Sequence, residues 1–362
     1  MKKILYFLLC LILCVGLGGS AFILYKNLAP EKTPSTQGGD ANADDGVGDA
    51  AGFEEPPTSS DNSTDEEETP LTPPADETSY ICDGMEMMAG ASVYMGSDSS
   101  LDPAIRFTCL IDNELKDAVE ADEDKSFAIL AAPLDYFDEV NPDSTTYIDW
   151  VNAFANANKT VILTTYDAYG TYNDYTSYIR FNLTNVLYNN INRRFVAMGV
   201  LIDNSGETPV YKYSAMPEGQ TYRSNARSVA YVAGAALNAH AIGETELPEA
   251  QHAKLLTYID MAVDKANGLS EYTNNGDMPE VTITSGTSIT MGLNGSHTID
   301  GTIEPTGLDI PARFVSSNES VVTVNEYGVL YARGYGSATV KMYYAGVEYT
   351  FSVTCSSNVQ YM

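Results

Sequence analysis

The stretch FVSSNESVVTVNEYGVLYARGYGSATV, residues 314–340, decides the fold of the C-terminal part of the chain. Its second half alternates apolar and polar side chains, the period of two that predicts strands with one buried face. A Tyr-Gly pair at 327–328 separates two runs at a point where the chain must turn. The residues expected on the buried face are Leu330, Ala332, Ala338 and Val340.

Short runs of the same kind extend from residue 279 to residue 355. The pairs Asn294-Gly295 and Ala345-Gly346 supply further turns between them. Many short strands separated by turns predict an all-β sandwich. The expected strands cover residues 281–283, 287–291, 297–299, 313–315, 321–324, 329–331, 338–344 and 349–353.

Residues 314–340 resemble the bacterial Ig-like domain of group 2. That family runs as an aromatic residue, S-S-N, a V-x-x-V strand, a turn that ends in Gly, a short apolar strand and G-x-A-x-[IV]. The aromatic residue is usually Trp, and here it is Phe314. The resemblance implies an Ig-like fold for residues 279–355, a structural or adhesive role on a bacterial surface, and no catalytic residues to carry over.

The N-terminal segment has the pattern of a membrane signal. Lys2 and Lys3 precede residues 4–25, which carry no charge. A helix of this length, rising about 1.5 Å per residue, crosses a bilayer core of about 30 Å. The lysines stay in the cytoplasm, so residues 1–29 are expected to anchor a single-pass protein of the cell membrane with most of the chain extracellular. The alternative is secretion after signal cleavage near Ala21.

Residues 30–79 are composed mainly of Pro, Gly, Ser, Thr, Asp and Glu, and hold fourteen acidic residues and one basic residue. Such a segment buries too little apolar surface to offset its backbone entropy. Like charges and prolines keep it extended. We therefore expect a disordered, acidic, Pro-rich linker that acts as a stalk.

Residues 80–275 predict a folded α+β domain, because a series of strands is followed by two helices. The helices are expected at residues 226–240 and 248–266, the second with Pro in its first turn and apolar residues at helical spacing. Short motifs such as GASV at 90–93 and NRRFVAMGV at 192–200 resemble an uncharacterised domain of Firmicutes surface proteins, which implies no activity. The expected strands cover residues 91–95, 104–111, 127–132, 160–166, 178–183, 195–202 and 209–213.

Five tyrosines of this domain recur at every third position. Exposed aromatic rings bind glycans by stacking on the C–H faces of sugars. The Asp, Gly and Asn residues between them predict a loop, and a period of three does not keep to one face of a strand. The alternative is a packed loop with half-buried rings and solvated hydroxyl groups. The candidate ligand-binding residues are Tyr166, Tyr169, Tyr172, Tyr175 and Tyr178.

Other polar clusters have structural interpretations. The acidic residues 120–124 offer oxygens to Ca²⁺ but lack the Gly and the distal Glu of a calcium loop, so a solvated helix end is expected. Cys82 and Cys109 either form an extracellular disulfide or remain buried thiols, with Cys355 left over. Internal ion pairs are expected for Arg193, Arg194, Arg223 and Arg227.

The sequence contains no motif for a catalytic nucleophile, a metal or a cofactor. A net charge of −30 repels the phosphates of nucleic acids. Together with the membrane signal, the resemblance to the bacterial Ig-like family implies a non-enzymatic bacterial cell-surface protein, a membrane-anchored display or adhesion module whose partners are host or cell-wall glycans or surface proteins. The alternative is a carbohydrate-active or wall-modifying enzyme that uses carboxylates of residues 80–275, because a carboxylate pair is recognised by geometry and not by sequence.

Overall fold

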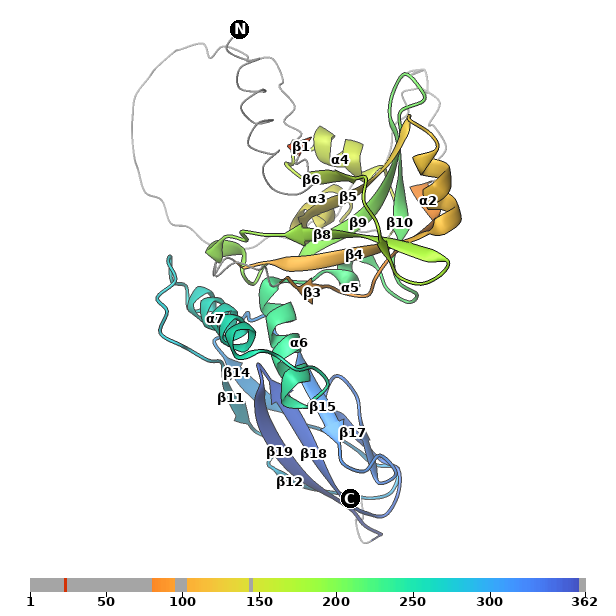
Figure 1. Ribbon diagram of the computed structural model, residues 1–362. Helices are drawn as coiled ribbons and strands as arrows, with labels where there is room; N and C mark the ends of the chain where they lie inside the picture. Colours follow the sequence, from red (N-terminus) through yellow and green to blue (C-terminus); the bar gives the residue numbers. More distant parts are fainter. Residues whose placement is uncertain (1–22, 25–79, 95–102, 143–145, 358–362) are drawn as a thin grey trace, which may run out of the picture. The chain divides into compact units, whose positions relative to one another are not determined.

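The computed structural model describes residues 23–24, 80–94, 103–142 and 146–357, which belong to one compact unit (Figure 1). The predicted acidic linker at residues 30–79 and all but two residues of the predicted membrane span lie outside this description. No helix within the described ranges is long and apolar enough to cross a membrane.

The two described residues of the N-terminal segment form strand β1 (Ile23–Leu24), which pairs antiparallel with β6 (Ile162–Tyr166). The prediction of a helix is wrong at these two residues. The physical reason is that β6 would be the outermost strand of the sheet without β1, and an extended backbone at residues 23–24 satisfies N–H and C=O groups of β6 that would otherwise lack ladder partners.

A mixed ten-stranded sheet forms the centre of residues 80–275, which we call the α/β part. Its strand order is β1-β6-β5-β9-β10-β2-β4-β8-β7, and β3 pairs with β4. Neighbouring strands are antiparallel except β10 and β2. The remaining bounds are β2 (Ile81–Met87), β3 (Ser92–Val93), β4 (Ile105–Asp112), β5 (Lys125–Pro133), β7 (Gly170–Thr171), β8 (Thr176–Leu183), β9 (Phe195–Asp203) and β10 (Val210–Ala215).

The central strands β5 and β9 are covered on both faces, which is why their sequences are apolar without alternation. One face of β5 packs against α3 (Leu134–Val140) and α4 (Trp150–Asn156), where the rings of Phe137 and Trp150 lie 4.9 Å apart. Its other face, with Phe127 and Ile129, belongs to the core that contains α6 (Val229–Ala241) and α7 (Glu249–Ala266). The short elements are α2 (Asn113–Glu120), α5 (Tyr222–Asn225) and η2 (Tyr188–Asn190).

The prediction of strands followed by two helices is therefore confirmed for residues 80–275. The structure contains every predicted strand and both predicted helices, with ends that differ by a few residues. Strands β2 and β7 and the short helices α3, α4, α5 and η2 were not predicted, and of α2 only its end at residues 120–124 was expected.

Residues 279–355 form an Ig-like β-sandwich, as predicted. Leu330, Ala332, Ala338 and Val340 are all buried, so the expected strand register is confirmed. The main sheets have the orders β12-β19-β18-β15 and β13-β17-β16, and β11 pairs with β14. The bounds are β11 (Glu280–Ile283), β12 (Ser288–Met291), β13 (Ser296–Thr298), β14 (Gly301–Glu304), β15 (Ala312–Ser316), β16 (Val322–Val324), β17 (Val329–Ala332), β18 (Gly336–Tyr344) and β19 (Val347–Cys355), of which β14 was not predicted.

Phe314 does not have the central position that the family resemblance implies. It is only partly buried and packs against the core from one side, with its ring against Gly328. The physical reason is that β15 is an edge strand of the four-stranded sheet, so one side of this ring lacks a neighbouring strand. The fully buried aromatic residue of the sandwich core is Phe351.

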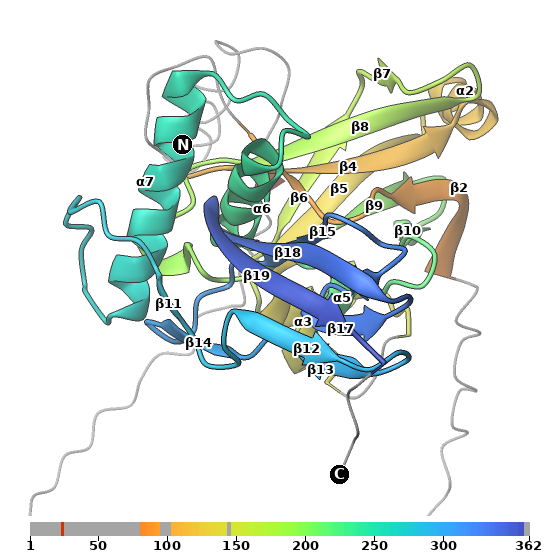
Figure 2. The same cartoon turned by 90° about the horizontal axis from the view of Figure 1, so that it is seen from below.

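Helix α6 of the α/β part packs against the sandwich, where it lies against β15, β18 and β19 (Figure 2). Ile310, Tyr344 and Ala345 of the sandwich belong to the same apolar core as α6 and α7. Asn238 of α6 is 2% exposed. Its Nδ2 donates to the carbonyl of Pro311 at 2.9 Å, and its Oδ1 accepts from the backbone N–H of Gly346 at 2.9 Å.

The contact between Gly234 and Ile310 gives a test of this junction. A Cβ at Gly234 would lie 2.6 Å from Cγ2 of Ile310. In an exposed helix, Gly→Ala stabilises by up to about 1 kcal/mol through propensity. We expect Gly234→Ala to show that gain only in an Ile310→Ala background, and in the otherwise unchanged protein to incur an overpacking cost of about 1–3 kcal/mol.

Denaturant unfolding of the four proteins in this mutant cycle measures the coupling. Equal effects of Gly234→Ala in both backgrounds would show that α6 does not pack against Ile310 in solution.

Candidate functional site

The five tyrosines lie on and between β6, β7 and β8, and the structure separates them into two groups. Tyr172 is 55% exposed and Tyr175 is 81% exposed. The other three are partly buried. The structure thus brings the five residues to one loop region but leaves only two rings largely free for a ligand.

The three partly buried tyrosines have defined partners. The ring of Tyr169 meets that of Phe127 edge-on at 6.0 Å, and Lys116 Nζ lies 5.7 Å from its centroid. Tyr178 is covered by the Arg180 guanidinium at 4.1 Å. Burial raises the pKa of Tyr166. These contacts match the packed-loop alternative for these three residues.

The turn that carries the exposed pair, residues 172–175, is held at several points; we call it the tyrosine turn. The backbone N–H groups of Tyr172 and Asn173 both donate to the carbonyl of Thr176, at 2.9 and 3.1 Å. Asn173 Oδ1 accepts from the N–H of Tyr175 at 2.8 Å. Just before the turn, a Cβ at Gly170 would lie 2.0 Å from Cζ of Tyr178, so a larger residue there would displace this ring.

Asn113, the first residue of α2, fixes the tyrosine turn from a distant part of the chain. Its backbone N–H donates to the carbonyl of Tyr175 at 2.9 Å, and its Nδ2 donates to the carbonyl of Asp174 at 3.1 Å. Its Oδ1 accepts from Ser177 Oγ at 2.7 Å. The two exposed rings are therefore presented on a backbone that is ordered before any ligand arrives.

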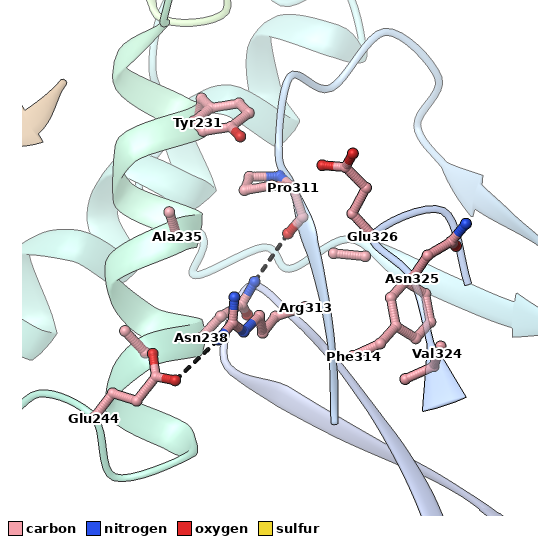
Figure 3. A pocket seen from close by; sticks show the side chains of 12 residues that line it. Tyr231, Ala235, Asn238, Glu244, Pro311, Arg313, Phe314, Val324, Asn325 and Glu326 are labelled. Atoms are coloured by element: carbon pink, nitrogen blue, oxygen red, sulfur yellow. Dashed lines mark hydrogen bonds and ion pairs between the residues drawn. The ribbon is translucent and has the colours of Figure 1, made fainter. Parts of the chain in front are cut away.

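A cavity of about 430 Å³ lies between α6 and the sandwich (Figure 3). Tyr231, Ala235 and Asn238 line it from the helix, and β15 and the turn at Asn325 and Glu326 line it from the other side. Its size suits a small ligand.

Two carboxylates line this cavity, those of Glu244 and Glu326. Glu244 is bound by Arg313, with Nη2 and Oε1 2.9 Å apart. Glu326 is the other carboxylate of the lining. Glycoside hydrolysis needs two carboxylates that act on one bond, one as acid and the other as nucleophile or base. The lining thus offers one carboxylate outside an ion pair.

The predicted ion pairs form for three of the four arginines: Arg193 with Asp135, Arg194 with Asp309, and Arg223 with Asp138. Among the described residues Arg227 has no carboxylate partner, contrary to the prediction: its Nη1 donates to the carbonyls of Ser224 and Ala226, and its guanidinium lies 4.6 Å from the ring centroid of Tyr231. These backbone acceptors and the ring take the place of a carboxylate.

The acidic residues 120–124 follow α2 as a helix end, as predicted. The Asp122 carboxylate pairs with Lys125, with 2.7 Å between Oδ2 and Nζ. This hydrogen bond holds the pKa of Asp122 below its usual range.

Cys82, Cys109 and Cys355 are buried free thiols, which is the alternative to a disulfide. Burial raises the pKa of Cys82 to about 11 and that of Cys109 to about 12. A catalytic cysteine needs an accessible thiolate. These two thiols therefore lack the environment of a nucleophile.

Comparisons with known proteins give only remote likenesses. No protein-family model matches the chain, and no curated protein sequence matches it. A C-terminal 282-residue fragment of intimin, crystallised with the intimin-binding domain of the translocated intimin receptor, is 8% identical, with a TM-score of 0.18. The match covers 74% of this chain and 62% of that fragment, so the chain spans less than two thirds of its length.

Two further solved structures are similar at the same level. Three Ig domains of titin, I67–I69, are 8% identical with a TM-score of 0.18, and 75% of this chain matches 65% of that one. HBP35 of Porphyromonas gingivalis is 9% identical with a TM-score of 0.18, and 75% of this chain matches 63% of that one. TM-scores this low carry no argument about fold or function. The Ig-like fold of residues 279–355 rests on its own strand order.

The hydrogen bonds of Asn113 generate a prediction about the tyrosine turn. Asn113→Ala removes both side-chain hydrogen bonds and keeps the backbone bond to Tyr175. Each is worth about 0.5–1.5 kcal/mol, so the amides of Tyr172 and Asn173 should exchange with deuterium roughly ten- to a hundred-fold faster.

Asn152→Ala, at an exposed asparagine of α4, is the matched control and should leave these exchange rates unchanged. Unaltered exchange in Asn113→Ala would show that the turn is ordered without this residue.

Proposed function

We propose that the protein is a non-enzymatic bacterial cell-surface protein, a membrane-anchored display or adhesion module. The part of residues 4–25 that precedes β1 anchors it in the cell membrane, the acidic residues 30–79 form a linker outside the membrane, and the described residues form the extracellular portion. The resemblance of residues 279–355 to the bacterial Ig-like domain of group 2 supports this proposal, as does the uncharged segment after Lys2 and Lys3. Secretion after cleavage near Ala21 is the alternative.

The tyrosine turn is the observation that carries a binding function. Tyr172 and Tyr175 expose large aromatic rings, which soluble domains do not need for folding. Rings on an ordered backbone bind at low entropic cost, because little is left to immobilise. We therefore assign this turn as the contact for a host or cell-wall glycan, with a surface protein as the second class of partner.

The charge of the protein favours an uncharged or basic ligand. The net charge is −30, and Asp174 lies between the two exposed tyrosines in the sequence. Acidic glycans would be repelled by this surface at low ionic strength. A neutral sugar stacks on an aromatic face without an electrostatic penalty.

The alternative enzyme uses carboxylates of the α/β part. It requires a pair of carboxyl groups on either side of a substrate in an open cleft. The cavity beside α6 carries one carboxylate outside an ion pair. The buried thiols of Cys82 and Cys109, with their raised pKa values, do not supply a nucleophile in place of a second carboxylate. These observations favour binding over hydrolysis.

The binding proposal predicts the effect of removing both exposed rings. Tyr172→Ala with Tyr175→Ala should weaken binding to the ligand found on a glycan array roughly five- to a hundred-fold, since each ring contributes about 0.5–1.5 kcal/mol. The melting temperature should stay unchanged, because neither ring is buried.

The matched control replaces two tyrosines of the sandwich that are similarly exposed, Tyr327 at 75% and Tyr335 at 60%. This control should bind like the unchanged protein. Equal losses in both double variants, or hydrolysis of a wall or host glycan by the purified protein, would contradict the proposed function.

The proposed topology predicts that protease added to cells without their wall releases the described part of the chain. The acidic stalk has the composition of a segment that proteases cleave readily. Immunoblotting of the medium with an antibody to residues 279–355 measures the release. Complete protection in intact cells, with cleavage only after lysis, would place the chain on the cytoplasmic side.

A further inference from the structure

Three carboxylates converge where α7 meets the loop that leads to β11, residues 267–279. Asp260 and Asp264 lie one turn apart on α7, and Asp277 belongs to the loop. One oxygen of each residue lies within 4.8 Å of the other two. Asp260 is 2% exposed and Asp264 is fully buried, whereas Asp277 is the most exposed of the three.

The loop wraps over the two buried carboxylates and donates hydrogen bonds to them. Asp260 Oδ2 accepts from the hydroxyl of Tyr272 and the N–H of Gly276, both at 2.9 Å, and its Oδ1 accepts from the N–H of Asp277 at 2.7 Å. Asp264 Oδ2 accepts from the N–H and the hydroxyl of Thr273, at 2.8 and 2.6 Å.

Asp264 Oδ1 is different, because it is sealed from solvent and accepts no hydrogen bond. Oδ1 and Oδ2 are bonded to the same carbon. Oδ1 therefore lies in the cluster or directly beside it, whichever of the two oxygens is the one close to Asp260 and Asp277. A buried carboxylate oxygen without a partner is costly. A cation bound beside this oxygen would supply the interaction that it lacks.

The cluster also has no positively charged partner in the described part of the chain. None of the ion pairs there involves Asp260, Asp264 or Asp277. Lys265, the next residue along α7, directs its Nζ to Asn189 Oδ1 at 2.7 Å.

We propose that Asp260, Asp264 and Asp277 bind a calcium ion that holds the α7–β11 loop on the helix. Ca²⁺ takes six to eight oxygen ligands at about 2.3–2.6 Å, so two of its ligands lie at most about 5 Å apart, which agrees with the 4.8 Å limit of the cluster. The loop offers further oxygens in its carbonyls and in Asn274 and Asn275. Mg²⁺ suits the site less, because it requires a rigid octahedron and retains its water.

Thermal melting of the full chain, in calcium chloride and in chelator, tests the site. Calcium should raise the melting temperature once its concentration exceeds about 0.1–1 mM, the Kd range of extracellular calcium modules, and the rise should then grow with the logarithm of the concentration.

Asp264→Asn should abolish the calcium-dependent rise in melting temperature, because it keeps the size of the side chain and removes its charge. Asp277→Asn, at the most exposed ligand, should weaken the rise. Because this position is less buried, the variant still tests the site if Asp264→Asn does not fold. Glu123→Gln, in the acidic run at the end of α2, is the matched control and should respond like the unchanged protein.

Two outcomes would overturn the proposal. The first is a melting temperature that is the same in calcium and in chelator, together with an Asp264→Asn variant that is more stable than the unchanged protein. That result would show that the buried charge of Asp264 destabilises the fold and that no cation neutralises it. The second is an equal response to magnesium, which would overturn the choice of calcium.

Discussion

The burial of helix α6 on several sides is the constraint on which the rest of the described structure depends. Its sequence is apolar around its circumference and rich in Ala, so no single neighbour covers it. The large sheet and α7 cover part of it, and the sandwich covers another part through Ile310, Tyr344 and Ala345. The two parts of the chain therefore share one core at this helix.

Asn238 gives this shared core its register. A buried amide is tolerated only when its donor and acceptor groups are both satisfied, and here the sandwich supplies the partners for both. Sliding the sandwich along α6 would leave the carbonyl of Pro311, the N–H of Gly346 and the amide itself unpaired in an apolar setting. Apolar contacts thus hold the parts together, and one polar side chain sets where they meet.

Charge contributes less to this junction than its ion pairs suggest. Arg313 and Glu244 are both more than half exposed, and pairs of this kind contribute about 0–1 kcal/mol. Asp309 is more buried, and its bond to Arg194 raises the pKa of that guanidinium. The larger effect of the charge is on partners, since an excess of acidic groups repels anions from the whole surface.

The sandwich was predictable because its signals are local. The alternation in residues 314–340 and the turn pairs determine strands and register within a few residues of each other. The burial of Phe314 was not predictable, because it depends on β15 being an edge strand, which is a property of the whole sheet. Strand β2 was missed because its buried residues, Cys82, Met85 and Met87, are not evenly spaced.

The candidate sites were also hard to predict, because they depend on residues that lie far apart in the sequence. The sequence located the tyrosine loop, but Phe127, Lys116 and Arg180 decide which rings are covered, and Asn113 orders the turn from another element. The carboxylate cluster was missed entirely. Its spacing, four residues along a helix and then thirteen more to Asp277, has no motif, and only the folded loop brings the third carboxylate back to the first two.

The loop from α7 to β11 is the one covalent connection between the α/β part and the sandwich, because the chain passes from one to the other once. A body attached at a single contact can pivot about it, whereas two separate attachments remove most of that freedom. Packing against α6 supplies the first attachment. On the proposed assignment, a calcium ion supplies the second by holding the connection on α7, since Asp277 lies three residues before β11 begins. Extracellular calcium would then stiffen the junction without contacting the tyrosine turn, so ligand contact and rigidity would depend on different residues and could be lost separately.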